Sequence, residues 1–254
     1  MRPTVTLETK CWENDWEFLL KTDRIERTID LSGYNFAKRT LCINNVDDMA
    51  KVTRHAERLV SSGILTDFII VRDHEKAALE FFELSREDLT SGFVYSIAEL
   101  VGLFVCSTEY LLHYSGDSRP LKKTPWLDSA LARMEKDSRA KVANLTWNAN
   151  YSEAAAESFA EDDNFYIGYG FSDQNYLVRT ADFRSPAVYH EKNPLSERYP
   201  GYGGELFEKR VDSWMRNHEH YRLTYRFGAY EHRNFPASGI RKKAELWRAR
   251  LGLR

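Results

Sequence analysis

The stretch RTLCINN, from Arg39 to Asn45, carries the clearest signal of the fold, together with DFIIV from Asp67 to Val71. The first stretch is a short apolar run that ends in polar residues, as a buried strand does before a loop. Apolar residues then recur at helical spacing over 49–60, after an aspartate at 47 or 48 that can cap a helix. The second apolar run follows soon afterwards. We therefore predict a strand, a helix and a second strand, with polar side chains after both strands.

The same alternation of helices and short strands continues along the chain. Further elements are expected as helices over 96–104, 126–136, 151–160 and about 205–217, and as strands over 110–114 and 142–147. Such alternation predicts a single α/β domain with a mixed, mainly parallel sheet flanked by helices. Ligands of open parallel sheets bind beyond the carboxyl ends of the strands, so we expect the loops after Ile43, Val71 and Tyr114 to face one crevice.

Composition excludes several classes of protein. The chain has 254 residues, and 36 Lys and Arg against 38 Asp and Glu give a formal net charge of -2, which argues against nucleic-acid binding over a whole surface. The longest stretch without Asp, Glu, Lys or Arg is 142–152, far shorter than the roughly 20 residues that span a bilayer. The first twenty residues carry six charged side chains and no apolar segment. We therefore expect a cytoplasmic protein without a secretory signal.

The spacing of the cysteines and the absence of several common motifs argue against several kinds of chemistry. Cys11, Cys42 and Cys106 are an odd number without C-x-x-C spacing, which disfavours a disulfide framework or a thiolate zinc site and predicts buried thiols. The sequence has no P-loop, no G-x-G-x-x-G after a strand and no G-x-S-x-G elbow. ATPase, hydride-transfer and serine-hydrolase chemistry therefore lose their usual support.

The first candidate for chemistry is Ser115-Gly116-Asp117, directly after the expected strand over 110–114. A carboxylate at a strand end can hold a divalent cation that bridges a diphosphate, and magnesium and manganese prefer such oxygen ligands. The alternative is that Asp117 only caps a turn. The sequence alone leaves both interpretations open.

Three further motifs follow downstream: GFSDQ from Gly170 to Gln174, GYGGELFEKR from Gly201 to Arg210, and His232. The glycine pair before Glu205 lets the backbone approach a substrate closely. Alternatively, Asp173 caps a turn, Glu205 only complements a helix dipole, and His232 is an ordinary surface or core histidine.

The order of these motifs resembles the GT-A fold of nucleotide-sugar glycosyltransferases over about Thr40 to Pro236. In that fold, the carboxylates of a D-x-D motif, and often a later histidine, coordinate the metal under the nucleotide diphosphate. Here Ser115 stands at the first acidic position. The resemblance therefore implies Asp117 and His232 as the ligands of Mn or Mg.

The same resemblance assigns roles to the other motifs. GYGGELFEKR is similar to the Gly-Gly-Glu-Asp of inverting galactosyltransferases, with Leu206 at the second acidic position. It implies Glu205 as the catalytic base and Gly204 as a neighbour of the sugar. FSDQ is similar to the Asp-Gln stretch that lines the sugar pocket of other GT-A enzymes. It implies sugar contacts for Asp173 and Gln174, and a catalytic role for Asp173.

We expect the nucleotide to contact residues at the strand ends: Asn44, Asn45, Asp73, Ser115 and Gly116. A uracil N–H needs a hydrogen-bond acceptor and its carbonyl groups need donors, which amide side chains supply. The implied function is transfer of a sugar from a UDP-sugar to the hydroxyl of an unknown acceptor, either a saccharide or a lipid-linked molecule. The main alternative is a nucleotide-sugar-binding protein without transferase activity.

This interpretation divides the chain into four parts. Residues 1–37 are expected to pack on the domain across the sheet, 38–120 to form the nucleotide-binding half, 121–239 the sugar or acceptor half, and 240–254 a basic C-terminal helix. Nucleic-acid binding, suggested by the many aromatic and arginine residues, is disfavoured by the net charge and by the lack of a basic aromatic stripe.

The C-terminal segment 240–254 is rich in basic residues. It sets Arg241, Lys242, Lys243, Arg248, Arg250 and Arg254 against one acid, Glu245, and Leu246, Trp247 and Leu251 offer apolar surface. A helix of this composition can make a peripheral contact with an anionic membrane. The alternative is a helix docked on its own domain with a solvated basic face.

Overall fold

The computed structural model describes residues 2–199, 201 and 204–251. All of the strands in these residues belong to one mixed sheet. The strand order is β3-β2-β1-β4-β9-β6-β10-β8-β7, and β5 pairs with β10 outside this path. The strands are β1 (Val5–Cys11), β2 (Lys38–Ile43), β3 (Asp67–Ile70), β4 (Tyr110–Tyr114), β5 (Ser118–Pro120), β6 (Ala140–Trp147), β7 (Ser158–Glu161), β8 (Phe165–Gly168), β9 (Asn175–Arg179) and β10 (Tyr221–His232). The half from β3 to β4 is parallel, and antiparallel β9 joins it to the mixed half. The predicted α/β class is confirmed.

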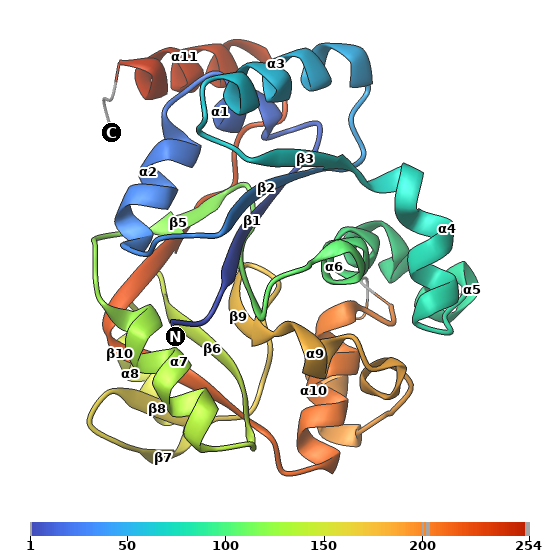
Figure 1. The fold of residues 1–254 in the computed structure, drawn as a ribbon, viewed down its shortest axis with the longest axis vertical. Helices are drawn as coiled ribbons and strands as arrows, with labels where there is room; N and C mark the ends of the chain where they lie inside the picture. The colour runs from blue at the N-terminus through green and yellow to red at the C-terminus, as the bar shows by residue number, and fades with distance from the viewer. Residues whose placement is uncertain (1, 200, 202–203, 252–254) are drawn as a thin grey trace.

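Helices cover both faces of this sheet (Figure 1). They are α1 (Trp16–Leu20), α2 (Arg24–Ser32), α3 (Met49–Ser61), α4 (Val71–Phe81), α5 (Arg86–Leu89), α6 (Phe93–Val105), α7 (Trp126–Lys136), α8 (Tyr151–Ala156), α9 (Thr180–Phe183), α10 (Phe207–Asn217) and α11 (Gly239–Arg250). One hydrophobic cluster joins α4, α6 and α10 to one face of the sheet, and a second joins α7 to the other. A third cluster packs α1 and α3 against β2.

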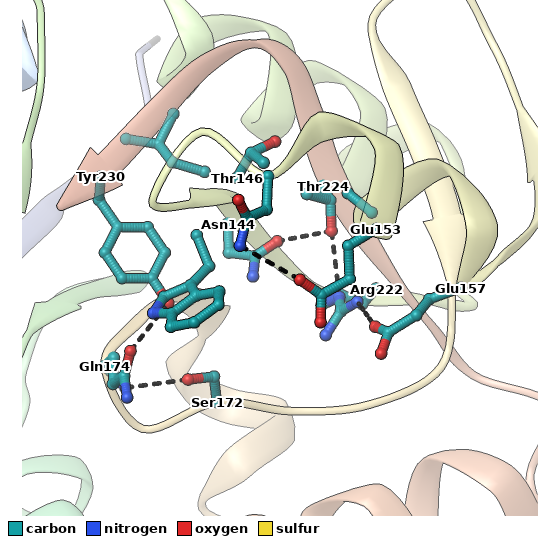
Figure 2. Close-up of a pocket in the computed structure, with 13 residues that line it drawn as sticks. Asn144, Thr146, Glu153, Glu157, Ser172, Gln174, Arg222, Thr224 and Tyr230 are labelled. Atoms are coloured by element: carbon teal, nitrogen blue, oxygen red, sulfur yellow. Dashed lines mark hydrogen bonds and ion pairs between the residues drawn. The ribbon is translucent and has the colours of Figure 1, made fainter. Parts of the chain in front are cut away.

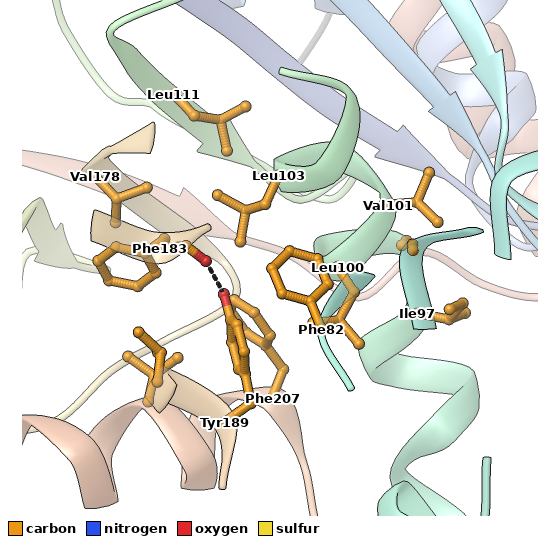
Figure 3. Packing of buried hydrophobic residues seen from close by; sticks show 14 of the residues in the cluster. Phe82, Ile97, Leu100, Val101, Leu103, Leu111, Val178, Phe183, Tyr189 and Phe207 are labelled. Atoms are coloured by element: carbon orange, nitrogen blue, oxygen red, sulfur yellow. Dashed lines mark hydrogen bonds between the residues drawn. The ribbon is translucent and has the colours of Figure 1, made fainter. Parts of the chain in front are cut away.

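Helix α6 is the centre of the largest cluster (Figure 3). Leu100, Val101 and Leu103 on this helix are completely buried. They pack with Phe82 after α4 and Phe207 of α10, and each such side chain contributes roughly 1.5–3 kcal/mol by leaving water. By length and composition the helical stretch Arg86–Val105 could cross a membrane, and 61% of its apolar window is buried inside the fold.

Residues 1–37, which we expected to pack across the sheet, contribute β1 to the sheet itself, whereas α1 packs against β2. β1 pairs in parallel with β2 on one side and with β4 on the other. Glu8 and Lys10 interrupt the apolar residues of β1, so the sequence alone did not indicate a buried strand here. Glu8 is 2% exposed and lies 2.9 Å from Nδ1 of buried His113, and this pairing makes the burial of a charged residue tolerable.

Two other elements depart from the sequence prediction. The helix expected over 151–160 ends at Ala156, because Ser158–Glu161 forms β7 and pairs antiparallel with β8. The C-terminal helix is present as α11, and the last residues of the expected range, 252–254, lie outside the described residues. Leu246 of α11 is buried on the domain, whereas Trp247 is 61% exposed. The three cysteines are free and buried, as predicted.

Candidate functional site

A cavity of about 540 Å³ lies beyond the carboxyl ends of β1, β2 and β4. It brings together most of the residues expected at the site: Asn44, Asn45, Ser115, Gly116, Asp117, Asp173, Gln174 and His232. Residues that sequence reasoning did not assign also line it, including Lys10, Trp12, Asp15, Val94 and Tyr95. The loops that follow three neighbouring parallel strands therefore meet at one edge of the sheet, as the fold class requires.

Asp117 and His232 form the charged pair of this cavity. β5 runs antiparallel to the end of β10, with Ser118 opposite His232, so the histidine reaches the Ser-Gly-Asp turn. Nε2 of His232 lies 3.1 Å from Oδ2 of Asp117, and the Ser115 hydroxyl donates to Oδ1 at 2.8 Å. Burial opposes ionisation of Asp117, but these hydrogen bonds hold the pKa of its carboxyl below its usual value. The hydrogen bond to Asp117 raises the pKa of His232.

The donor set of this pair fits part of a divalent metal site. A carboxylate that stays ionised and an imidazole nitrogen are both suitable ligands for Mn²⁺, and Mg²⁺ is usually held by one or two carboxylates plus phosphate oxygens and water. Within the residues that the structure describes, no group of three His, Cys, Asp or Glu side chains converges as a metal site. Asp117 and His232 could therefore supply two ligands, and the other coordination positions would have to be filled by a bound molecule or by water.

Gly116 is required by the close approach of its loop to Asp15. A Cβ atom at this position would lie 2.5 Å from Oδ2 of Asp15 and 2.7 Å from the carbonyl oxygen of Lys10. The Asp15 carboxyl accepts a hydrogen bond from the backbone N–H of Trp12 at 2.8 Å, and burial raises its pKa to about 8. At neutral pH this carboxyl is therefore mainly uncharged and adds little negative charge behind the loop.

Asp173 faces a lysine and a second carboxyl group. Nζ of Lys10 pairs with buried Glu99 and lies 3.8 Å from Oδ2 of Asp173. The backbone N–H of Asp173 donates to Oε1 of Glu208 at 2.8 Å. Burial, and then the charge of Asp173, raises the pKa of Glu208 well above its usual value. Sequence reasoning missed Glu208, although it stands three residues after Glu205 in the GYGGELFEKR motif.

Three predicted residues are not brought to the cavity. Asp73 lies in the first turn of α4, which begins at Val71 as soon as β3 ends, and its side chain is 58% exposed. The Glu205 carboxylate accepts a hydrogen bond from Nζ of Lys209 at 2.9 Å, and Gly204 packs against Thr90. Neither Gly204 nor Glu205 is among the residues that line the cavity. Residues 202 and 203 of the same motif lie outside the described residues.

A second, polar pocket of about 270 Å³ adjoins this cavity (Figure 2). Gln174 lines both hollows and accepts a hydrogen bond from the hydroxyl of Tyr230 at 3.3 Å. Glu157 lies 3.6 Å from Arg222, and Asn150 donates to Glu153 at 3.3 Å.

The turn that follows β6 shapes the rim of this pocket. Trp147 is 42% exposed and lines the pocket. Asn148 and Ala149 both have positive φ, at 44° and 58°, a conformation that costs energy for residues other than glycine. The side-chain carbonyl of Asn148 accepts a hydrogen bond from the backbone N–H of His232 at 2.8 Å. The strained turn thus links the pocket to the Asp117 and His232 pair.

Comparisons with known proteins agree with this fold. No protein-family model matches the chain, and no curated protein matches it in sequence. The structure of CMP:2-keto-3-deoxy-manno-octonic acid synthetase complexed with CTP is similar with a TM-score of 0.52 and 13% identity, over 98% of this chain and 97% of that one. GalNAc-T7 with UDP, GalNAc and Mn²⁺ has a TM-score of 0.57 and 9% identity, over 92% of this chain and 44% of that one. A mycobacterial protein has a TM-score of 0.50 and 13% identity, over 99% of this chain and 76% of that one.

These likenesses concern the fold. The chain spans less than half of the length of GalNAc-T7, and all three identities are too low to carry an activity across. One fold serves many reactions, so function has to be argued from the site. The chain therefore has a GT-A-like α/β fold, with a cavity of about 540 Å³ at the sheet edge where a nucleotide is expected.

Proposed function

We propose that this protein is a metal-dependent glycosyltransferase that moves a sugar from a UDP-sugar to an acceptor hydroxyl. One observation carries the proposal: the strand-end cavity contains the Asp117 and His232 pair and Asp173, and it adjoins a second polar pocket at Gln174. A transferase needs two adjacent sites, one for the donor and one for the acceptor.

The residues that line the cavity are suited to binding the donor nucleotide. The amides of Asn44 and Asn45 supply both donors and acceptors for a uracil ring. Trp12 and Tyr95 are about half exposed and offer aromatic faces for stacking on the base. The diphosphate would lie beside Ser115 and Gly116, where the loop approaches without a Cβ atom.

Asp117 and His232 are the residues that would hold Mn or Mg. When bound, the metal neutralises negative charge on the departing diphosphate. The chain's own contribution is to keep the Asp117 carboxylate ionised, which the hydrogen bonds from Ser115 and His232 achieve.

Asp173 is our choice for the group that accepts the proton of the acceptor hydroxyl. Its side chain is 30% exposed and lines the cavity. The next residue, Gln174, lines both the cavity and the adjoining pocket. Glu208 accepts the hydrogen bond of the Asp173 backbone N–H at 2.8 Å and so holds this part of the loop in place. Glu205, which the resemblance implied as the base, is ion-paired with Lys209 and does not line the cavity.

The acceptor is a saccharide or a lipid-linked molecule that enters the pocket of Figure 2. The exposed face of Trp147 can pack against a sugar ring, and Glu153 and Asn150 offer hydrogen bonds to its hydroxyls. For a lipid-linked acceptor, a peripheral contact between basic α11 and an anionic membrane would bring enzyme and substrate together. We also propose a cytoplasmic location, and a relationship to majastridin, a bacterial protein with the GT-A fold.

Calorimetry of UDP binding with manganese, and with a chelator, tests the donor half of this proposal. We expect UDP to bind and manganese to tighten binding. Asp117→Ala should remove the effect of manganese, and His232→Ala should act in the same way, whereas Asp173→Ala should leave UDP affinity within about twofold. Equal losses for Asp117→Ala and Asp173→Ala would contradict the assigned roles, and no binding of UDP would remove the proposal.

The alternative, a nucleotide-sugar-binding protein without transferase activity, is favoured by two substitutions in the motifs. Ser115 replaces the first carboxylate of a D-x-D motif, and Leu206 replaces the second acid after the glycine pair. Release of UDP from UDP-glucose, UDP-galactose and UDP-N-acetylhexosamines distinguishes the two functions. Binding of a UDP-sugar without any release of UDP, in the presence of manganese and a panel of saccharide acceptors, would favour the binding protein.

A further inference from the structure

A basic recess, separate from the two hollows of the candidate site, lies where α11 meets α1 and α2. Its volume is about 160 Å³, and residues of α2, β5, α11 and the segment after β10 line it. Figure 1 shows α11 beside α1, with α2 below them. We call it the arginine recess, after the residues that define it: Arg24, Arg27, Arg119, Arg233, Arg248 and Phe235.

Positive charge exceeds negative charge in this recess. Five guanidinium groups and three carboxylates line it. Each carboxylate already pairs with one arginine of the recess: Asp23 with Arg27, Glu231 with Arg119, and Glu245 with Arg233. Arg24 and Arg248 remain without an ion pair among the residues that the structure describes. Both cations therefore line one small volume without a direct ion pair, although the carboxyl groups of Glu231, Asp117 and Asp15 act on Arg24 from a greater distance.

Arg24 is the buried member of this pair, with 9% of its surface exposed. Its Nε donates to the carbonyl oxygen of Gly116 at 2.9 Å, and its guanidinium lies 5.0 Å from the ring centroid of Phe235. Its Nη2 is buried and has no hydrogen-bond partner in the described part of the chain. Burial, followed by the neighbouring charge of Arg119, lowers the pKa of Arg24 to about 10.

A buried cation with an unused donor is costly for a protein, because burial removes the water that would otherwise solvate it. An anion in the recess would place additional negative charge beside both guanidinium groups. Arg248 lies on the last turns of α11, exposed and on the rim of the same recess. The planar guanidinium group is suited to phosphate because two of its N–H groups can bind two oxygens of one phosphate.

We propose that the arginine recess binds a phosphate-type dianion between Arg24 and Arg248. The small volume suits inorganic phosphate or the phosphomonoester end of a larger molecule, which includes a lipid headgroup. The ligand would connect α2 to α11, whose outer face is exposed to solvent. This inference does not depend on the proposed glycosyl transfer, because neither Arg24 nor Arg248 lines the donor cavity or the polar pocket.

Calorimetric titration of the full chain with inorganic phosphate, in the presence of a chelator, tests the site. We expect one saturable site, with affinity reduced about tenfold or more by Arg248→Gln, since a charge-assisted hydrogen bond is lost. Arg250→Gln is the matched control, because Arg250 is also exposed on α11 but does not line the recess. It should change phosphate affinity by less than about twofold.

Three further measurements complete the test. Arg24→Gln should reduce phosphate affinity as much as Arg248→Gln does. Circular dichroism shows whether the Arg24→Gln variant folds. If this variant does not fold, the Arg248→Gln variant alone tests the site. Saturating UDP should leave phosphate affinity unchanged, and competition between the two would place phosphate in the donor cavity and overturn the proposal. Sedimentation with phosphatidic acid vesicles that requires Arg248 identifies the source as a lipid headgroup; phosphate binding without sedimentation identifies a soluble phosphate. No saturable binding, or equal affinity in the Arg248→Gln and Arg250→Gln variants, would also refute the site.

Discussion

Replacing Asp15 by asparagine should reduce the pH dependence of the unfolding free energy between pH 5 and pH 8. The Asp15 residue is 3% exposed, and burial raises the pKa of its carboxyl from 3.8 to about 8. The folded protein therefore keeps a proton that the unfolded chain releases near pH 4. Stability linked to this carboxyl is fully present below pH 4 and is lost as the pH rises toward 8.

The size of the effect follows from the pKa difference. Each pH unit between the two pKa values lowers the unfolding free energy by about 1.4 kcal/mol. From pH 5 to pH 8 the wild-type protein should thus lose about 4 kcal/mol through Asp15. Asparagine keeps the side-chain oxygen that accepts the N–H of Trp12, so the variant should lose none of this amount.

Urea unfolding followed by circular dichroism at pH 5, 6, 7 and 8 measures this difference. The variant should gain stability relative to the wild type at every step of increasing pH. Asp163→Asn, which changes an exposed carboxylate, is the control. If the difference between Asp15→Asn and the wild type varied by less than about 1 kcal/mol over this range, Asp15 would be ionised in the folded protein and our account of the loop would fail.

Other substitutions test the packing around the site and the core. Gly116→Ala should weaken UDP binding at least tenfold and cost about 1–3 kcal/mol of stability, since its Cβ would overlap Asp15 and the backbone of Lys10; unchanged calorimetry and urea unfolding would show that the loop is less constrained. Glu208→Ala should cost about 2 kcal/mol by removing the acceptor of the Asp173 N–H, whereas Glu208→Gln should stay within about 1 kcal/mol at pH 7 because it keeps that acceptor; equal losses would mean that Glu208 acts as an anion. Leu100→Ala should lower the unfolding free energy by about 2–5 kcal/mol, and a loss below 1 kcal/mol would contradict its central place in the core.

Local sequence patterns were enough to predict one edge of the candidate site. The loops after β2 and β4 were expected to face one crevice because both strands read as apolar runs that end in polar residues, and Asn44 and Ser115 do line one cavity. The same reasoning failed for Asp73. A helix begins directly at the end of β3, so no loop turns the Asp73 side chain toward the cavity. The sequence alone does not show whether a strand is followed by a loop or directly by a helix.

Hydrophobic periodicity and turn residues are local properties, and they determined from the sequence alone that this chain is an α/β domain with a Ser-Gly-Asp loop after a central strand. Contacts between distant residues decided the rest. His232 meets Asp117 across 115 positions because β5 and β10 are paired. Glu8 is buried in β1 because His113 lies beside it on β4, and Glu208 rather than Glu205 reaches Asp173 from the start of α10. The energy of a buried charge depends on the partner and the water around it, and only the folded chain supplies those partners.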